Sequence, residues 1–169
     1  MIDATRVDSL SGDDWQRYRD IRLRSLEINP EAFGGKHEVE SLWSEEQWRE
    51  QMKKFDALVA SRGGVDVAVM TVEVLNGDHG STCWIGGCWS DPAVRGSGSF
   101  RALFDYLDQH ASTRGWMRQG LGVWRDNDAA IKAYSALGFT RAGEPQPSTS
   151  RPGLFYIHMM RDSIRSPDD

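Results

Sequence analysis

Two segments of the chain carry residues whose types and spacing favour ligand chemistry. The first is glycine-rich and consists of Arg95, Gly96, Ser97, Gly98, Ser99 and Phe100. Glycine lets a backbone approach an anion closely, and the N–H groups that open a helix bind phosphate. Arg95 adds a charge-assisted contact. No Gly-Lys-Ser/Thr follows and a third glycine is missing, so this is neither a P-loop nor a dinucleotide fingerprint. A tight turn is the alternative interpretation.

The second segment covers residues 123–139, where Asn127 and Tyr134 are seven positions apart. On a helix this spacing places them on nearly the same face, about two turns from each other. An asparagine at a helix start can hydrogen-bond an amide-rich ligand. A tyrosine hydroxyl can act as a proton donor. A core aromatic with its hydroxyl at the surface is the competing interpretation of Tyr134.

The elements that must position these segments follow from hydrophobic periodicity. Helices are predicted up to Ile28, from a cap at Ser44, from Phe100 to a stop at Gly115, and from a cap at Asp126 to Leu137. Strands are predicted at Ala4–Leu10, Ala57–Ser61, Val65–Leu75, Ser81–Trp89, Leu121–Trp124, Phe139–Gly143 and Leu154–Met160. A run of strands followed by strand–helix–strand crossovers predicts an α/β fold, with a mixed sheet and helices on both faces.

Length and charge limit the class of protein. The 169 residues predict a single domain over residues 1–164 and a frayed tail at 165–169. A net charge of −5 disfavours nucleic-acid binding, and no stretch is apolar enough to span a membrane. Cys83 and Cys88 are interpreted as buried, inert thiols, and no close set of histidines and cysteines predicts a metal site. Two cysteines without a secretory leader favour a cytoplasmic protein.

Together the two segments resemble the GNAT superfamily of acyl-CoA N-acyltransferases. The glycine-rich segment is similar to the family pattern Arg/Gln-x-x-Gly-x-Gly/Ala, with matches at Arg95 and Gly98, whereas Phe100 stands where a small residue is usual. The more specific match is to Asn-x-x-Ala-x-x-x-Tyr-x-x-x-Gly-Phe, at Asn127, Ala130, Tyr134, Gly138 and Phe139. The resemblance is strongest over residues 81–139.

The resemblance implies a central, mostly antiparallel sheet of about seven strands, with a V-shaped splay between the fourth and fifth strands. It implies acetyl-CoA as the cofactor, with its pyrophosphate on the backbone of residues 95–100. The strand edge at Trp89 and Ser90 would pair with the pantetheine arm, and Asn127 would contact the pantetheine or the phosphate side. Tyr134 would protonate the departing thiolate. Phe100 either narrows the phosphate cradle or turns its ring into the core.

The general base is not fixed by the sequence. An alkylamine is protonated at pH 7, so a group must remove its proton before attack. The family often uses a glutamate on the central strand, but Ser81–Ser90 contains no carboxylate. Glu73 on the preceding strand is the candidate base, whereas Asp91 is better interpreted as a turn-forming residue before Pro92 and His79 as a solvated turn residue.

The resemblance predicts an N-acetyltransferase that acts on the primary amine of a small molecule by direct attack. The acceptor would bind near the first two helices and the loop Pro145–Pro152. Phe33, Trp43 and Tyr156 are candidate walls, each with core packing as the stronger alternative. A protein or peptide N-acetyltransferase and a non-catalytic acyl-CoA-binding regulatory module remain the alternatives. A monomer and a homodimer are both compatible with the sequence.

Overall fold

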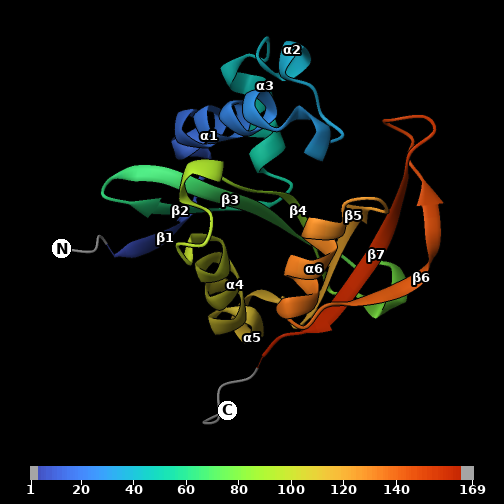
Figure 1. The fold of residues 1–169 in the computed structure, drawn as a ribbon. Coiled ribbons are helices and arrows are strands. Elements are labelled where there is room, and N and C mark those ends of the chain that lie inside the picture. The colour runs from blue at the N-terminus through green and yellow to red at the C-terminus, as the bar shows by residue number, and fades with distance from the viewer. Residues whose placement is uncertain (1–3, 165–169) are drawn as a thin grey trace. The chain divides into compact units, whose positions relative to one another are not determined.

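The computed structural model describes residues 4–164 (Figure 1). Within these residues seven strands form one sheet in the order β1-β2-β3-β4-β5-β7-β6. They are β1 (Thr5–Leu10), β2 (Asp56–Arg62), β3 (Val65–Val74), β4 (Cys83–Ser90), β5 (Arg118–Trp124), β6 (Thr140–Pro147) and β7 (Phe155–Asp162). β4 pairs in parallel with β5, and the registers of β1–β2, β2–β3, β5–β7 and β6–β7 are antiparallel. The predicted mixed, mostly antiparallel sheet is confirmed.

The helices of the described residues are α1 (Trp15–Ile28), α2 (His37–Glu40), α3 (Glu45–Met52), α4 (Ser99–Gln109), α5 (Ala111–Arg114) and α6 (Asp128–Ala136). The predicted cap at Ser44 is confirmed, because its hydroxyl accepts from the Gln47 N–H at 3.2 Å and the Gln47 side chain accepts from the Ser44 N–H at 2.8 Å. None of the helices within residues 4–164 is long and apolar enough to cross a membrane.

Several predicted boundaries were wrong, among them the start of β5, which is Arg118 rather than Leu121. The helix expected from Phe100 to Gly115 is interrupted at His110, which caps α5. The cap of α6 is Asn127 rather than Asp126, because the Asn127 side chain accepts from the Ala130 N–H. β6 continues to Pro147, since a register shift between Ala142 and Gln146 lets the strand resume beyond the predicted end. The loop expected to begin at Pro145 therefore begins after Pro147.

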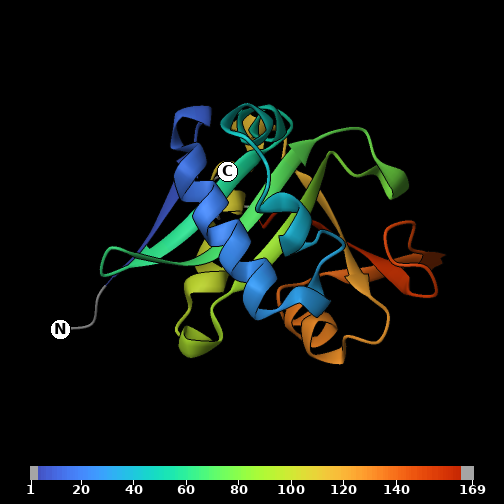
Figure 2. The ribbon, with the colours of Figure 1, turned by 90° about the horizontal axis from the view of Figure 1, so that it is seen from above.

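The chain divides into two compact units. The first contains the residues up to Glu73 together with Gly87–Leu107, and the second contains Val74–Gly86 together with the residues from Asp108 onward. In the first unit α1 and α3 cover one face of β1–β3 and α4 covers the other (Figure 1), and α1 runs across β2 and β3 (Figure 2). The single domain over residues 1–164 stays a prediction, and the tail at 165–169 lies outside the described residues.

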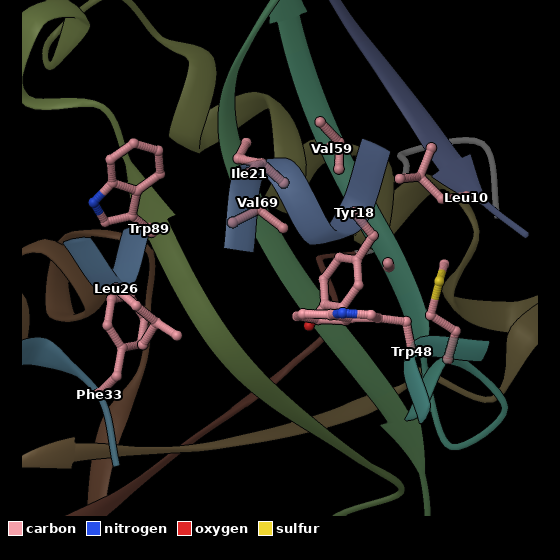
Figure 3. Packing of buried hydrophobic residues seen from close by; sticks show 11 residues of the cluster. Leu10, Tyr18, Ile21, Leu26, Phe33, Trp48, Val59, Val69 and Trp89 are labelled. Atoms are coloured by element: carbon pink, nitrogen blue, oxygen red, sulfur yellow. The ribbon is translucent and has the colours of Figure 1, made fainter. Parts of the chain in front are cut away.

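Buried apolar side chains in the core of the first unit hold α1 against the sheet (Figure 3). Tyr18, Ile21 and Leu26 recur at helical spacing, and each is at most 5% exposed. The Tyr18 and Trp48 rings meet edge to face, with centroids 5.9 Å apart. The cluster comprises Leu10, Tyr18, Ile21, Leu26, Phe33, Trp48, Met52, Ala57, Val59, Val69 and Trp89. α1 is thus held on the sheet by apolar packing along one stripe.

A buried polar network joins the elements of the second unit. Arg161 on β7 forms an ion pair with Asp108 at 2.8 Å, with 4% and 12% of the two side chains exposed. Its Nη1 donates to the Leu137 carbonyl oxygen at 2.8 Å, and its Nε donates to the Gln119 side chain at 2.8 Å. Leu137 is the C-cap of α6. One guanidinium therefore fixes the C-terminal end of the helix that carries Tyr134.

Candidate active site

The glycine-rich loop lies at the start of α4. Asp91 caps the short 3-10 turn Pro92–Val94, since its carboxylate accepts from the Ala93 N–H at 2.9 Å. Gly96 and Gly98 then have φ angles of +83° and +87°. This left-handed conformation favours glycine, although no atom lies within 4 Å of a carbon placed at either Cβ position. Glycine is thus favoured at Gly96 and Gly98 by the backbone conformation and not by a lack of space for a side chain.

Arg62 at the end of β2 braces this loop. Its Nη1 donates to the Ser97 carbonyl oxygen at 3.0 Å. In a trans peptide the next N–H points opposite to the carbonyl, so the Gly98 N–H points away from Arg62. The Ser97 and Ser99 hydroxyls are 2.9 Å apart. The first N–H groups of a helix have no intrahelical acceptor, and α4 begins at Ser99. N–H groups at a helix start are of the kind that bind phosphate, and phosphate binding by this loop stays a prediction.

Phe100, which departs from the family pattern, does not fill the loop with its ring. The ring packs edge to face on Phe104, with centroids 5.2 Å apart. Phe104 is buried, whereas Phe100 is half-buried and Arg95 is exposed. Of the two predicted alternatives for Phe100, the structure has the ring turned along α4 toward the core.

Trp89 belongs to the core by its side chain. The ring is 3% exposed, its Nε1 donates to Asn29 Oδ1 at 2.9 Å, and the Arg24 guanidinium lies 5.3 Å from its centroid. Only the backbone of Trp89 is therefore available for a ligand along this strand. The role predicted for Trp89 and Ser90, pairing with the pantetheine arm, needs only backbone groups. Within the second unit, β4 pairs in parallel with β5 from Cys83 to Ile85, and the splay between these strands stays a prediction.

In the second unit, Asn127 and Tyr134 lie at the start and in the last turns of α6. The Asn127 amide oxygen accepts from the Ala130 N–H at 3.2 Å, which leaves its amide nitrogen for a ligand. The Tyr134 side chain is largely buried, with 9% of the residue exposed, and its ring meets Phe139 edge to face at 5.9 Å. The Cζ atom of Arg161 lies 5.1 Å from the ring centroid of Phe139. The Tyr134 ring therefore packs on a residue that is itself held in place from another direction.

The candidate bases occupy different environments. Glu73 is exposed and follows Thr71 by two positions, so both side chains lie on one face of β3. Asp91 makes the turn contact that was predicted for it. His79 is exposed, but the solvated interpretation was incomplete, since its ring meets the buried His158 edge to face at 5.5 Å. Cys88 is half-buried, in contrast to the buried Cys83, so the prediction of two buried thiols was wrong for Cys88.

The three candidate acceptor walls all make packing contacts. Phe33 is 6% exposed and lies in the core of the first unit. Trp43 packs against Trp48 with centroids 4.9 Å apart. Tyr156, in the second unit, stacks on His158 at 5.4 Å. Each of the three side chains therefore has a packing role in the structure. Their contact with an acceptor stays a prediction.

Sequence reasoning missed a buried ion pair in the first unit. Arg22 on α1 donates to both carboxylate oxygens of Glu40, at 2.9 and 3.0 Å. A signal was available, because Arg22 follows the buried Tyr18 by four positions and therefore lies on the same helix face. Arg62 was missed because its partner is 35 positions away. Within residues 4–164 no cluster of His, Cys, Asp and Glu suits a metal ion.

Comparison with known protein families gives a match over most of the chain. The sequence profile described as the acetyltransferase (GNAT) family matches residues 15–139. The chain belongs to this family. GNAT proteins are acyl-CoA-dependent transferases, and acetyl-CoA is their acyl donor. A search of curated proteins finds no match.

Several solved structures share the GNAT fold of this chain. A GNAT-family acetyltransferase from Streptococcus pneumoniae has a TM-score of 0.74 at 13% identity, over 94% of this chain and 99% of that one. The ribosomal-protein-S18-alanine N-acetyltransferase of Escherichia coli has a TM-score of 0.67 at 22% identity, over 98% of both chains. A Salmonella typhimurium protein solved with its cofactor acetyl-CoA has a TM-score of 0.69 at 19% identity, over 96% of both. At these identities the likeness establishes the fold.

Proposed function

We propose that this GNAT protein transfers the acetyl group of acetyl-CoA to the primary amine of a small molecule. The observation that carries the proposal is the braced loop ahead of α4, where Gly96 and Gly98 are left-handed and Arg62 holds the Ser97 carbonyl. Such a loop at a helix N-terminus suits a diphosphate. The family match supports its use for the donor.

Residues of the first unit hold the donor in this proposal. The backbone of residues 95–100 binds its diphosphate, Arg95 adds a charged contact, and the backbone of Trp89 and Ser90 pairs with its amide-rich arm. From the second unit, the Asn127 amide nitrogen donates to the same ligand. When bound, acetyl-CoA supplies the activated thioester that the amine attacks.

Two side chains move protons in the proposed reaction. Glu73 takes the proton that a protonated amine must lose before it can attack. The Tyr134 hydroxyl donates a proton to the departing thiolate, and the phenolate takes up the second proton that the adduct nitrogen must lose, so that the products leave as a neutral amide and a free thiol. Its buried ring, seated on Phe139, supports this role because a proton donor must be held in a fixed position.

A protein N-terminus is the second candidate acceptor. Among the solved structures that share the fold are ribosomal-protein-alanine N-acetyltransferases from Escherichia coli and Brucella melitensis. The acceptor of this chain would then be an N-terminal amine rather than a small molecule. A non-catalytic acyl-CoA-binding module is the third candidate, and the retention of Tyr134 argues against it, because a binder has no use for a proton donor.

The proposal is tested in two steps. Calorimetry with acetyl-CoA measures donor binding, and release of free thiol is then followed with a panel of small amines and of peptides with alanine at the N-terminus. Micromolar binding, and release of thiol from acetyl-CoA when small amines are present, support the proposal. Release from peptides alone supports the protein acetyltransferase. Binding without release from any acceptor supports the regulatory module.

A further inference from the structure

The Arg22–Glu40 ion pair is largely buried, and Arg22 is the more exposed of its two side chains. Both oxygens of Glu40 are engaged, by Nε and Nη2 of Arg22. The Glu40 side chain is 7% exposed and the Arg22 side chain 16%. Since Glu40 accepts one hydrogen from Nε and one from Nη2, both hydrogens of Nη1 remain for another acceptor.

The pair is closed on its other sides. Phe33 lies under the guanidinium, with its ring centroid 5.2 Å from the Arg22 Cζ. A carbon placed at the Cβ position of Gly35 would lie 2.1 Å from Glu40 Oε2 and 2.6 Å from Arg22 Nη2, so no side chain fits there. Tyr18 is buried in the same region, and burial raises its pKa to about 12. The orientation of the guanidinium is therefore fixed by its surroundings.

The remaining Nη1 group faces β4. A carbon placed on Gly87 would lie 3.5 Å from Nη1 and 4.0 Å from the Thr71 hydroxyl. Gly87 has a φ of +58°, which interrupts the extended backbone of β4 two residues before Trp89. All of these residues belong to the first unit. The guanidinium thus points to the strand along which the proposed function places the donor's arm.

We propose that Arg22 is a specificity-determining residue that binds a carboxylate of the acceptor, so that the substrates are amines that carry a carboxylate, as amino acids do. This inference rests on the proposed function. A guanidinium binds carboxylates through its planar fork, and Glu40 leaves one edge of that fork open. Glu40 itself is not a site for a cationic amine, because Arg22 occupies both of its oxygens and Gly35 covers it.

The direct test compares acceptors that differ in the carboxyl group alone. The panel contains several amino acids, their carboxamides and the amines that lack the carboxyl group, each assayed by thiol release from acetyl-CoA. We expect kcat/KM to be about tenfold or more higher for the carboxylates than for either neutral series. Equal values for the three series would overturn the inference, as would turnover of the neutral amines alone.

Two variants separate recognition from a structural role. Arg22→Lys removes the fork, and we expect the preference for carboxylates to fall to about threefold or less, with unchanged acetyl-CoA affinity. Glu40→Gln keeps the guanidinium and removes the competing negative charge, so the preference should rise. If the ion pair only stabilised the fold, each variant would lower the turnover of carboxylate and neutral acceptors by the same factor. That result would contradict the inference.

Controls keep the outcomes distinct. Arg19→Lys alters an arginine on the same helix that pairs with exposed Asp20, and it should leave the preference unchanged. Thermal unfolding reports whether each variant folds, and the double variant Arg22→Gln/Glu40→Gln replaces the ion pair by neutral groups if Arg22→Lys does not fold. The same loss of carboxylate preference is expected from it. Absence of acetyl-CoA binding by the wild type would instead refute the proposed function itself.

Discussion

The guanidinium of Arg62 donates to the carbonyl oxygen of Ser97 at 3.0 Å, across 35 positions of the chain. This single contact ties the end of β2 to the loop that precedes α4. It fixes the direction of the Ser97–Gly98 peptide, whose N–H is directed away from β2. The loop conformation is therefore specified by a residue that belongs to neither family motif.

Removal of this brace should weaken donor binding. We expect Arg62→Ala to raise the Kd for acetyl-CoA about tenfold, because the peptide that Arg62 holds becomes free to rotate. Calorimetry measures the change. Arg6→Ala, which removes another arginine at the surface of the same sheet, is the matched control and should leave the Kd unchanged. An unaltered Kd in Arg62→Ala would show that the loop needs no brace.

The left-handed glycines offer a second prediction. Gly98→Ala introduces a side chain at a φ of +87°, which costs about 1–2 kcal/mol in that conformation. The loop relieves this strain by leaving its present form, so acetyl-CoA affinity should fall about tenfold. Gly153 has a φ of +90° and equally open surroundings, so Gly153→Ala imposes the same strain elsewhere. If both variants bound acetyl-CoA equally well, the loop would not be the phosphate site.

Tyr134→Phe isolates the proposed proton donor. The ring contact with Phe139 is retained, so the variant should fold and its Kd for acetyl-CoA should stay close to that of the wild type. We expect kcat to fall about a hundredfold, which is the usual size of a general-acid contribution. Thiol release under saturating acetyl-CoA measures it. Tyr106→Phe removes a hydroxyl from α4 and serves as the control, and equal kcat values for the two variants would exclude Tyr134 as the donor.

His158 makes stability depend on pH. Burial lowers its pKa, with a further lowering by His79 that Asp78 opposes. The unfolded chain therefore binds the proton more readily than the folded protein, and stability falls as the pH decreases below about 6.5. Thermal unfolding of the wild type and His158→Gln between pH 7.5 and 5 is the measurement. The wild-type Tm should decrease more steeply, and parallel profiles would contradict the prediction.

Local patterns predicted the parts of the fold that local physics determines. The Ser44 capping box and the apolar stripe of α1 depend on residues a few positions apart, so the sequence displays them. The extension of β6 to Pro147 was missed because its pairing with β7 overrides the local pattern, and the break at His110 was missed as well. The two motifs located the loop and the body of α6 for the same reason that the Ser44 cap was found, because each depends on residues close in the sequence.

The parts of the site that were missed depend on contacts between distant residues. Arg62 reaches Ser97, and Arg22 reaches Glu40 across 18 positions, so neither pair has a signature in a short window. The cap at Asn127 differs from the predicted one by a single position, because Asp126 and Asn127 are both good caps. Only the folded chain decides which of the two side chains meets the Ala130 N–H.

The exposed strand β6 also has a consequence for how the molecule behaves in concentrated solution. It is the outermost strand at its end of the sheet, and nearly all of its residues are exposed. An outer strand with a full row of N–H groups invites intermolecular sheet extension and aggregation. Pro145 and Pro147 carry no N–H, and the irregular register between Ala142 and Gln146 bends the row. This border therefore makes a poor template for a neighbouring chain, which protects the protein against edge-to-edge polymerisation.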